Sequence, residues 1–409
     1  MSGVDRDVAE PAGGLPRIIF KLRQQGPYWI ARRLSAEAVH PTTGPGRLLH
    51  ALTRRTITAV SALPRLVRRN AQARFPAAER TLFAFYDLKV GPITFDCLWF
   101  LTGADLERRR RGLDMIHIVI VPGPYEGVRR ERDDYEAVVD PANRGERIQN
   151  ILVQACALLP SCAAVTQAAS REEAAFFRSV AARHVFPADY EPALPVFPSS
   201  QMCLDAARQG EGPIAVLRAT PERQRNIERW LGARGLSDRR LVTVTLRGYK
   251  YMPARNSDIA AWTAFARGLD PQRYAVVFVP DTEETMEGIP AALDGCIVMP
   301  EAAWNVGLRM ALYQHAFVNL GVNTGPMGLC WLNEAARYAT LKMAPPGVPQ
   351  TTLDYFRHLG FEPGRSFPFA TPCQRLVWED DSRQAIDRAF AELVARIERG
   401  GPADAGAGA

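Results

Sequence analysis

The 409-residue sequence lacks the features that define several common protein classes. No apolar run approaches the ~18–20 residues needed to span a bilayer. The opening residues, MSGVDRDVAEPAGG, lack the charged-then-apolar order of a secretory signal. The patterns GxxxxGK[ST] and GxSxG are also absent, which disfavours a P-loop NTPase and an α/β-hydrolase.

Cysteine and histidine are sparse and show no metal-binding spacing. The seven cysteines are scattered, mostly within apolar runs, and no CxxC pair or Cys/His cluster accompanies them. Scattered cysteines of this kind are typical of reduced core residues in a cytoplasmic protein. The absence of a metal-binding cluster disfavours a structural zinc site.

Positive charge is modest overall but unevenly placed. The net charge is +6, yet residues 17–74 hold twelve arginines and lysines and one acid, a local charge of +11. Apolar residues interleave with them, so 16–34 and 46–74 can each form a basic amphipathic helix. Such a helical arm, residues 15–75, either binds an anionic membrane surface on the cytoplasmic side or packs on the body with solvated arginines. No nucleic-acid-binding motif accompanies the charge, so we expect no nucleic-acid partner.

Alternating strand and helix patterns from residue 80 onward predict an α/β protein of two successive domains, each with a mostly parallel sheet. A proline- and glycine-rich stretch, 187–213, separates two such series and contains the expected domain boundary. The predicted segments are a disordered 1–14, the arm 15–75, an N-terminal domain 76–205, a C-terminal domain 206–380, a helix 381–399 and a disordered tail 400–409.

Four polar loops follow predicted strand ends in the C-terminal domain. Because the carboxyl ends of parallel strands meet at one edge of a sheet, we expect these loops to bind a nucleotide diphosphate there. Each has an ordinary alternative: packing arginines, solvated lysines or helix-start acids. The candidate donor-binding residues are Arg247, Lys250, Arg255, Asn256, Asp281, Glu283, Glu301, Asn323, Thr324, Gly325, Pro326 and Met327.

The stretch around Asn323 carries the clearest of these patterns. A short apolar run, 316–320, breaks into a glycine-containing turn and resumes as a helix-compatible segment from Met327 to Leu332. A strand, a glycine turn and a helix start present free backbone N–H groups and a helix dipole to an anion. The alternative is an ordinary strand-to-helix turn of a parallel sheet.

Two carboxylates follow the first predicted strand of the N-terminal domain. Asp87 ends the strand 81–88, and Asp96 lies just beyond Gly91-Pro92. Either is placed to act as a general base at a cleft between the domains, or to cap the next helix. The turn at 122–126, after the second strand, is expected either to shape an acceptor pocket or to be a plain loop.

The run NLGVNTGPMGLCW resembles the Asp-Thr-Gly-Pro-Met-His loop of the ADP-heptose–lipopolysaccharide heptosyltransferases. Residues 323–327 match four positions of that motif, with Asn323 standing for the Asp, and Gly328 stands for the His. The loop 247–258 also looks loosely like the arginine-bearing loop by which GT-B fucosyltransferases hold a GDP diphosphate. The resemblance does not cover the basic arm.

The resemblance implies a GT-B fold, with two Rossmann-like domains, and a metal-independent glycosyltransferase that needs no cofactor besides its nucleotide-sugar co-substrate. A nucleotide-sugar donor would sit on the C-terminal domain, with Thr324 and Gly325 at its phosphates and Arg247 and Arg255 (or Lys250) neutralising the departing diphosphate. A ribose would be held by Glu283 or Glu301, and Asp87 or Asp96 would deprotonate a hydroxyl of a glycan or lipid-linked acceptor. Two alternatives stay open: a sugar-nucleotide 2-epimerase-like enzyme and a non-catalytic sugar- or nucleotide-binding protein.

Overall fold

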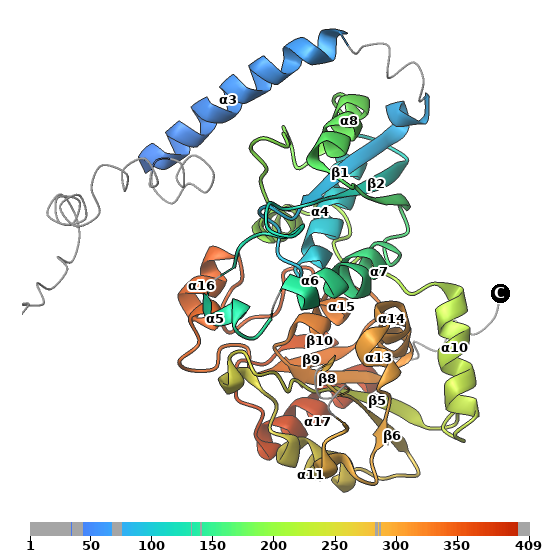
Figure 1. Cartoon of the computed structure of the whole chain (residues 1–409). Coiled ribbons are helices and arrows are strands. Elements are labelled where there is room, and N and C mark those ends of the chain that lie inside the picture. Colours follow the sequence, from blue (N-terminus) through green and yellow to red (C-terminus); the bar gives the residue numbers. More distant parts are fainter. Residues whose placement is uncertain are drawn as a thin grey trace, which may run out of the picture.

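The computed structural model describes residues 34, 44–67, 76–131, 133–139, 141–282, 285 and 288–399. The disorder predicted for 1–14 and 400–409, nearly all of the first amphipathic helix and Glu283 lie outside these residues. Two α/β domains lie one above the other, and helix α3 (Gly44–Val67) projects from the upper one (Figure 1). No helix among the described residues is long and apolar enough to cross a membrane.

The N-terminal domain is built on a four-stranded parallel sheet in the order β3-β2-β1-β4. Its central strand β1 is buried along its whole length, because alternate residues face helices on opposite sides. Leu82 and Ala84 pack with α4, whereas Phe83 and Phe85 pack on the side of α8. The elements are β1 (Thr81–Asp87), α4 (Cys97–Arg110), β2 (Met115–Val121), β3 (Cys162–Gln167), α8 (Arg171–Ala181) and β4 (Val185–Phe186).

The C-terminal domain has a six-stranded parallel sheet in the order β10-β9-β8-β5-β6-β7. This is the doubly wound order, and it reverses direction between β5 and β8, where ligands bind in open parallel sheets. The predicted fold class, two Rossmann-like domains, is therefore confirmed. The strands are β5 (Arg240–Thr245), β6 (Tyr274–Val279), β7 (Ile297–Val298), β8 (Val318–Val322), β9 (Tyr338–Leu341) and β10 (Gln374–Leu376).

Helices cover both faces of the larger sheet. On one face α10 packs against α14, and on the other α11 packs against α17, where Phe265 and Phe390 meet edge to face. The helix predicted over 381–399 thus belongs to the core of the C-terminal domain. The bounds are α9 (Gln201–Arg208), α10 (Pro221–Gly232), α11 (Ile259–Gly268), α13 (Glu301–Trp304), α14 (Val306–His315), α15 (Gly328–Trp331), α16 (Leu353–His358) and α17 (Arg383–Arg399).

Three helical segments depart from a single regular α-helix. The apolar-periodic segment 144–159 is divided among α6 (Pro141–Arg147), a π-helical segment (Ile148–Val153) and α7 (Gln154–Cys156). The segment 303–313 is divided at Asn305, whose side chain caps α14 by accepting a hydrogen bond from the Leu308 N–H at 2.9 Å. The helix after Asn323 is one 3-10 turn followed by one α-helical turn. Its macrodipole is correspondingly small.

The two domains share one apolar core rather than a polar hinge. Trp99 of α4 lies 5.6 Å from Phe367, ring centroid to centroid, and Trp331 of α15 lies 5.4 Å from the same ring. The backbone N–H of Arg218 donates to the Leu158 carbonyl at 2.8 Å. These contacts hold the carboxyl edges of the two sheets toward each other.

Gly321 illustrates how tightly the switch point is packed. A Cβ at this position would lie 2.9 Å from the Thr245 carbonyl oxygen and 3.0 Å from the Met327 sulfur. Only glycine therefore lets β5, β8 and the following turn approach so closely.

Gly321→Ala is expected to lower the free energy of unfolding by about 1–3 kcal/mol, the usual cost of forcing atoms into a packed core. The matched control is Gly145→Ala in α6, where no atom lies within 4 Å of the added Cβ and where alanine gains helix propensity. Urea unfolding of both variants measures the difference. An equally stable Gly321→Ala protein would contradict this account.

Candidate functional site

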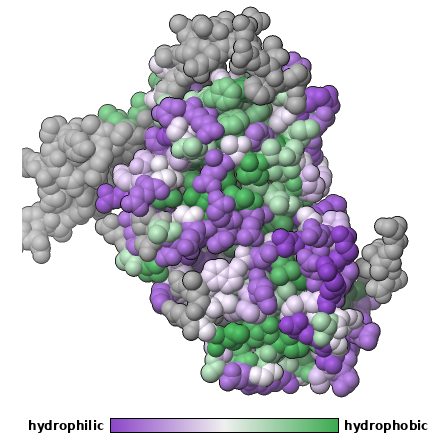
Figure 2. Space-filling view, turned by 45° about the vertical axis from the view of Figure 1, so that its right-hand side comes forward, coloured by the Kyte–Doolittle hydropathy of each residue, from purple (hydrophilic) through white to green (hydrophobic). Residues whose placement is uncertain are grey.

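The strand-end loops of the two domains are in direct contact. A Cβ at Gly325 would lie 3.0 Å from the Phe95 ring, and one at Gly328 would lie 3.1 Å from Leu98. Phe95 and Leu98 belong to the segment that opens α4, so the two stretches singled out in the sequence meet face to face. Hydrophilic residues form a band across the molecule at this height (Figure 2).

Asp96 lies at this contact with an exposed carboxylate. It occupies the N-cap position of α4, yet its side chain makes no capping hydrogen bond. The Thr94 hydroxyl donates to it at 2.8 Å. Burial is the main cause that lowers the pKa of Arg255 and raises the pKa of Tyr355, and the negative charge of Asp96 opposes the first shift and adds to the second. Asp96 therefore lies within electrostatic range of two residues of the C-terminal domain.

Asp87 lies elsewhere and is not available as a base. Its carboxylate is fully buried and accepts two hydrogen bonds from Arg171, at 2.8 and 2.9 Å. The Tyr190 hydroxyl donates at 2.6 Å and the Lys89 N–H at 2.9 Å. A buried carboxylate with this set of donors is stabilised as a structural ion pair. The expectation that Asp87 faces the cleft is thus corrected: it ties β1 to α8 and to the segment after β4.

Arg247 is also structural rather than exposed to a ligand. Only 5% of it is accessible, and it donates to the carbonyls of Tyr251 at 2.6 Å and Met252 at 3.1 Å, and to the Asn256 side chain. The Asn256 amide in turn donates to the Tyr249 carbonyl at 3.1 Å. Arg247 and Asn256 therefore form the internal framework of the loop after β5. Asp258, and not Asn256 or Ser257, caps the following helix.

Arg255, at the end of that loop, lacks a charged partner. Its guanidinium donates one hydrogen bond, to the Asn323 carbonyl at 3.0 Å. Its Nε is fully buried without a hydrogen-bond partner, and no carboxylate of the described chain forms an ion pair with it. Burial lowers its pKa, partly offset by Asp96 and by Tyr251 and Tyr355. A desolvated, unpaired guanidinium is costly, so an anion binding beside it would recover that cost.

Arg309 is a second buried arginine at this edge of the sheet, which sequence reasoning missed, and its charge lies near the Asp281 carboxylate. It lies on α14, is only 2% exposed, and has a buried Nε without a partner. One weak bond, at 3.4 Å, runs to the Pro280 carbonyl at the end of β6. The available signal was a lone arginine inside the otherwise apolar stretch VGLRMALY. Buried arginines thus lie behind the ends of both β6 and β8.

The predicted acids and the lysine are spread along the same edge of the sheet. Asp281 accepts from the N–H groups of Thr282 at 2.7 Å and Gly248 at 3.3 Å, and burial raises its pKa against the nearby charge of Arg309. Glu301 is exposed at the start of α13, after the edge strand β7, which lies two strand spacings, about 10 Å, from β5. Lys250 is exposed in the loop after β5.

Asn323 has a structural reason to be an amide. Its side-chain NH₂ donates to the Met343 carbonyl at 2.8 Å, which links the end of β8 to the end of β9. An aspartate cannot donate this bond. Thr324 is buried without capping the turn, Gly325 and Pro326 begin it, and Met327 is buried beneath Gly321.

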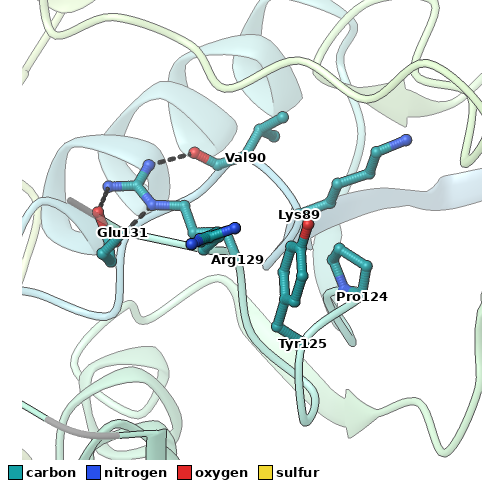
Figure 3. Close-up of a pocket in the computed structure, with 7 residues that line it drawn as sticks. Lys89, Val90, Pro124, Tyr125, Arg129 and Glu131 are labelled. Carbon is teal, nitrogen blue, oxygen red and sulfur yellow. Dashed lines mark hydrogen bonds and ion pairs between the residues drawn. The ribbon is translucent and has the colours of Figure 1, made fainter. Parts of the chain in front are cut away.

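A cavity of about 550 Å³ opens at the carboxyl ends of β1 and β2 (Figure 3). Arg129 is held there by the Val90 carbonyl at 2.6 Å and by Glu131, while the Tyr125 ring stands exposed at its side. The turn predicted to shape an acceptor pocket thus borders a cavity. The lining residues are Lys89, Val90, Pro124, Tyr125, Arg129, Arg130 and Glu131.

Tyr355 of α16 lies within electrostatic range of Arg129 at this cavity and of Arg255. Partial burial and the charge of Asp96 raise its pKa, whereas Arg255 and Arg129 lower it. The pKa of Tyr355 thus depends on one arginine from each domain and on the Asp96 carboxylate. Sequence reasoning missed both Tyr355 and Arg129, since an isolated tyrosine and an arginine in a charged run carry no distinctive pattern.

A second contact between the domains holds the loop after β5 from the other side. Arg147 donates to the Tyr249 hydroxyl at 2.9 Å and to the Tyr135 hydroxyl at 3.3 Å. The ring of Tyr135 in turn meets Tyr251 edge to face at 5.2 Å. The N-terminal domain therefore helps to fix the position of the loop that carries Arg255.

Within the described residues, no group of three or more His, Cys, Asp or Glu side chains is placed to hold a metal ion. The expectation that this site works without a metal stays a prediction.

No family model and no curated protein matches the chain. Among solved structures, it is similar to the glycosyl transferase family 9 protein from Veillonella parvula (12% identity, 77% of this chain and 97% of that one, TM-score 0.48). It is also similar to E. coli ADP-heptose lps heptosyltransferase II (9% identity, 78% of this chain and 99% of that one, TM-score 0.45). A third similar structure is fucosyltransferase NodZ from Bradyrhizobium (12% identity, 62% of this chain and 94% of that one, TM-score 0.28). At these identities and TM-scores no activity follows for this chain, and its fold class rests on its own strand orders.

Asn323→Asp is expected to lower the free energy of unfolding by about 1–3 kcal/mol, because the Met343 carbonyl loses its donor and faces a carboxylate. Asn305→Asp is the matched control: Asn305 accepts from the Leu308 N–H, which an aspartate does equally well. Thermal unfolding of both variants separates the two roles. An equal loss of stability in the two variants, or no loss in Asn323→Asp, would contradict the role of Asn323 as a hydrogen-bond donor.

Proposed function

We propose that this chain is a glycosyltransferase that moves a sugar from a nucleotide-sugar donor to a hydroxyl of a glycan or lipid-linked acceptor. The donor would bind on the C-terminal domain, at the switch point between β5 and β8, and the acceptor at the cavity of the N-terminal domain. Asp96 would lie between them. The resemblance of residues 319–331 to the heptosyltransferase loop agrees with this assignment.

The observation that carries the proposal is Arg255. It is a guanidinium with a buried, unpaired Nε, located where a doubly wound sheet binds its ligand. A diphosphate would supply the charge and the acceptors that this side chain lacks. Arg309 and Asp281 lie at the neighbouring strand end, where Asp281 would face a ribose. Lys250 and the exposed Glu301 would act, if at all, at the rim of the site.

The proposed reaction is a single displacement at the anomeric carbon. Asp96 takes the proton of the acceptor hydroxyl, and the hydroxyl oxygen forms a bond to the anomeric carbon. The bond from that carbon to the diphosphate oxygen breaks, and its electron pair leaves with the diphosphate. Arg255 stabilises the negative charge that develops on this leaving group, as fixed donors do in a site that excludes water.

The charge of the N-terminal cavity favours an anionic acceptor. Lys89, Arg129 and Arg130 line it, and its one acid, Glu131, is paired with Arg129. A phosphate or carboxylate on the acceptor would therefore find a net positive surface next to Asp96. The exposed Tyr125 ring adds a face on which a sugar can stack.

Arg255→Ala is expected to weaken binding of a nucleoside diphosphate by about 1.5–3 kcal/mol while leaving the melting temperature unchanged or higher, because a desolvated charge is removed. Calorimetry with UDP, GDP, ADP and CDP measures this. The control is Arg337→Ala at the amino end of β9, on the opposite edge of the same sheet. Arg247→Ala is expected instead to lower stability. Unchanged affinity in Arg255→Ala would remove it from the site.

Asp96→Asn is expected to lower kcat by about 100- to 10,000-fold, the usual contribution of a positioned base, with nucleotide affinity retained. The readout is acceptor-dependent release of nucleoside diphosphate from the matching nucleotide sugar. Turnover without any acceptor would favour a 2-epimerase-like or hydrolytic enzyme. Tight nucleotide binding by the wild type with no turnover on any acceptor would favour a non-catalytic binding protein.

A further inference from the structure

Helix α3 exposes leucines on one side. Leu48 is 65% exposed and Leu52 is 53% exposed, although both belong to a regular helix. At 100° per residue the two lie about 40° apart, on one face. The sequence continues this spacing with Ala59, Leu63 and Leu66. As far as Thr56, the helix therefore presents Leu48 and Leu52 on a side that the body does not cover, with Arg55 about 20° from Leu48 on the same side.

The contact between α3 and the body comes from the opposite side of the helix. Arg54 donates to the Ala188 carbonyl of the N-terminal domain at 2.5 Å. Arg54 lies about 200° around the helix from Leu52. The body therefore meets the polar side of α3, which leaves the leucine face turned away from it, in agreement with the separate rod in Figure 1. A helix that served only to pack on the body would be turned the other way.

The charges on α3 select among possible partners for this face. Arg47 and Arg55 are both exposed, and the helix carries no acidic residue from end to end. The stretch 17–74 around it has a charge of +11, whereas the rest of the chain sums to −5. Two such helices from two copies would place arginines against arginines, and an acidic lipid surface would neutralise them.

We propose that α3 binds in the interface of an anionic lipid bilayer, with Leu48 and Leu52 among the acyl chains and Arg47 and Arg55 at the phosphates. Arg54 keeps the body on the water side of the helix. Ala188 begins the segment that reaches Ala193, whose carbonyl accepts from Lys89 of the N-terminal cavity at 3.5 Å. If the proposed function is right, this arrangement holds the acceptor cavity near the lipid surface; the docking itself does not depend on that function.

The test is co-sedimentation of the full chain with vesicles of phosphatidylcholine, alone or with phosphatidylglycerol. We expect binding to the anionic vesicles, its loss in the Leu48→Glu/Leu52→Glu variant, and about a fivefold weakening for each of Arg47→Gln and Arg55→Gln. Leu52→Glu and Ala51→Glu form a matched pair, because the same charge is added at neighbouring positions 100° apart. Ala51→Glu should weaken binding far less.

Three results would overturn the proposal: no binding of the wild type to anionic vesicles, equal binding to neutral ones, or equal losses in Leu52→Glu and Ala51→Glu. A wild-type dimer that the Leu48→Glu/Leu52→Glu change dissociates, seen by light scattering without lipid, would instead assign the face to a second copy. Nucleotide binding measured on the same variants should be unchanged. Failure of the docking is thereby separated from failure of the nucleotide site.

Discussion

The close packing of two glycines against α4 is the constraint on which the proposed site depends. Gly325 and Gly328 leave room for Phe95 and Leu98, and a side chain at Gly325 would crowd the Phe95 ring. The same contact carries Asp96 to the C-terminal domain and sets Arg255 beside the Asn323 carbonyl. A shared aromatic core behind it fixes the angle between the two sheets. The geometry of the cleft is thus a consequence of packing.

The arginines of the site divide into two physical classes. Arg247 and Arg171 are saturated with carbonyl and carboxylate acceptors, so they stabilise a loop and a strand end. Arg255 and Arg309 are desolvated yet keep an Nε without a partner. A buried guanidinium without a full set of acceptors, as in Arg255 and Arg309, is typical of sites that a ligand completes. Arg247 and Arg171 have their acceptors within the protein and need no ligand.

The loop that resembles the heptosyltransferase motif differs from it at a position with a clear structural task. Asn323 donates to the Met343 carbonyl, so the amide at this position joins β8 to β9. What the loop offers a ligand is its backbone and the guanidinium held against it. The helix that follows is too short to add a strong dipole. An asparagine in place of the aspartate of the motif is therefore compatible with a working site.

The sequence by itself determined the two parallel α/β domains, the strand-end loops and the basic helical arm, because periodicity and turn residues are local properties. It also singled out Arg255, Asp96 and the turn at 122–126. It did not distinguish Asp87 from Asp96, or Arg247 from Arg255, since each pair has the same chemistry at similar strand ends. Nor did it find Arg129, Arg309 or Tyr355. These residues differ in burial, in the number of their hydrogen-bond partners and in contact with the other domain. Such differences arise only when segments that are distant in the chain meet.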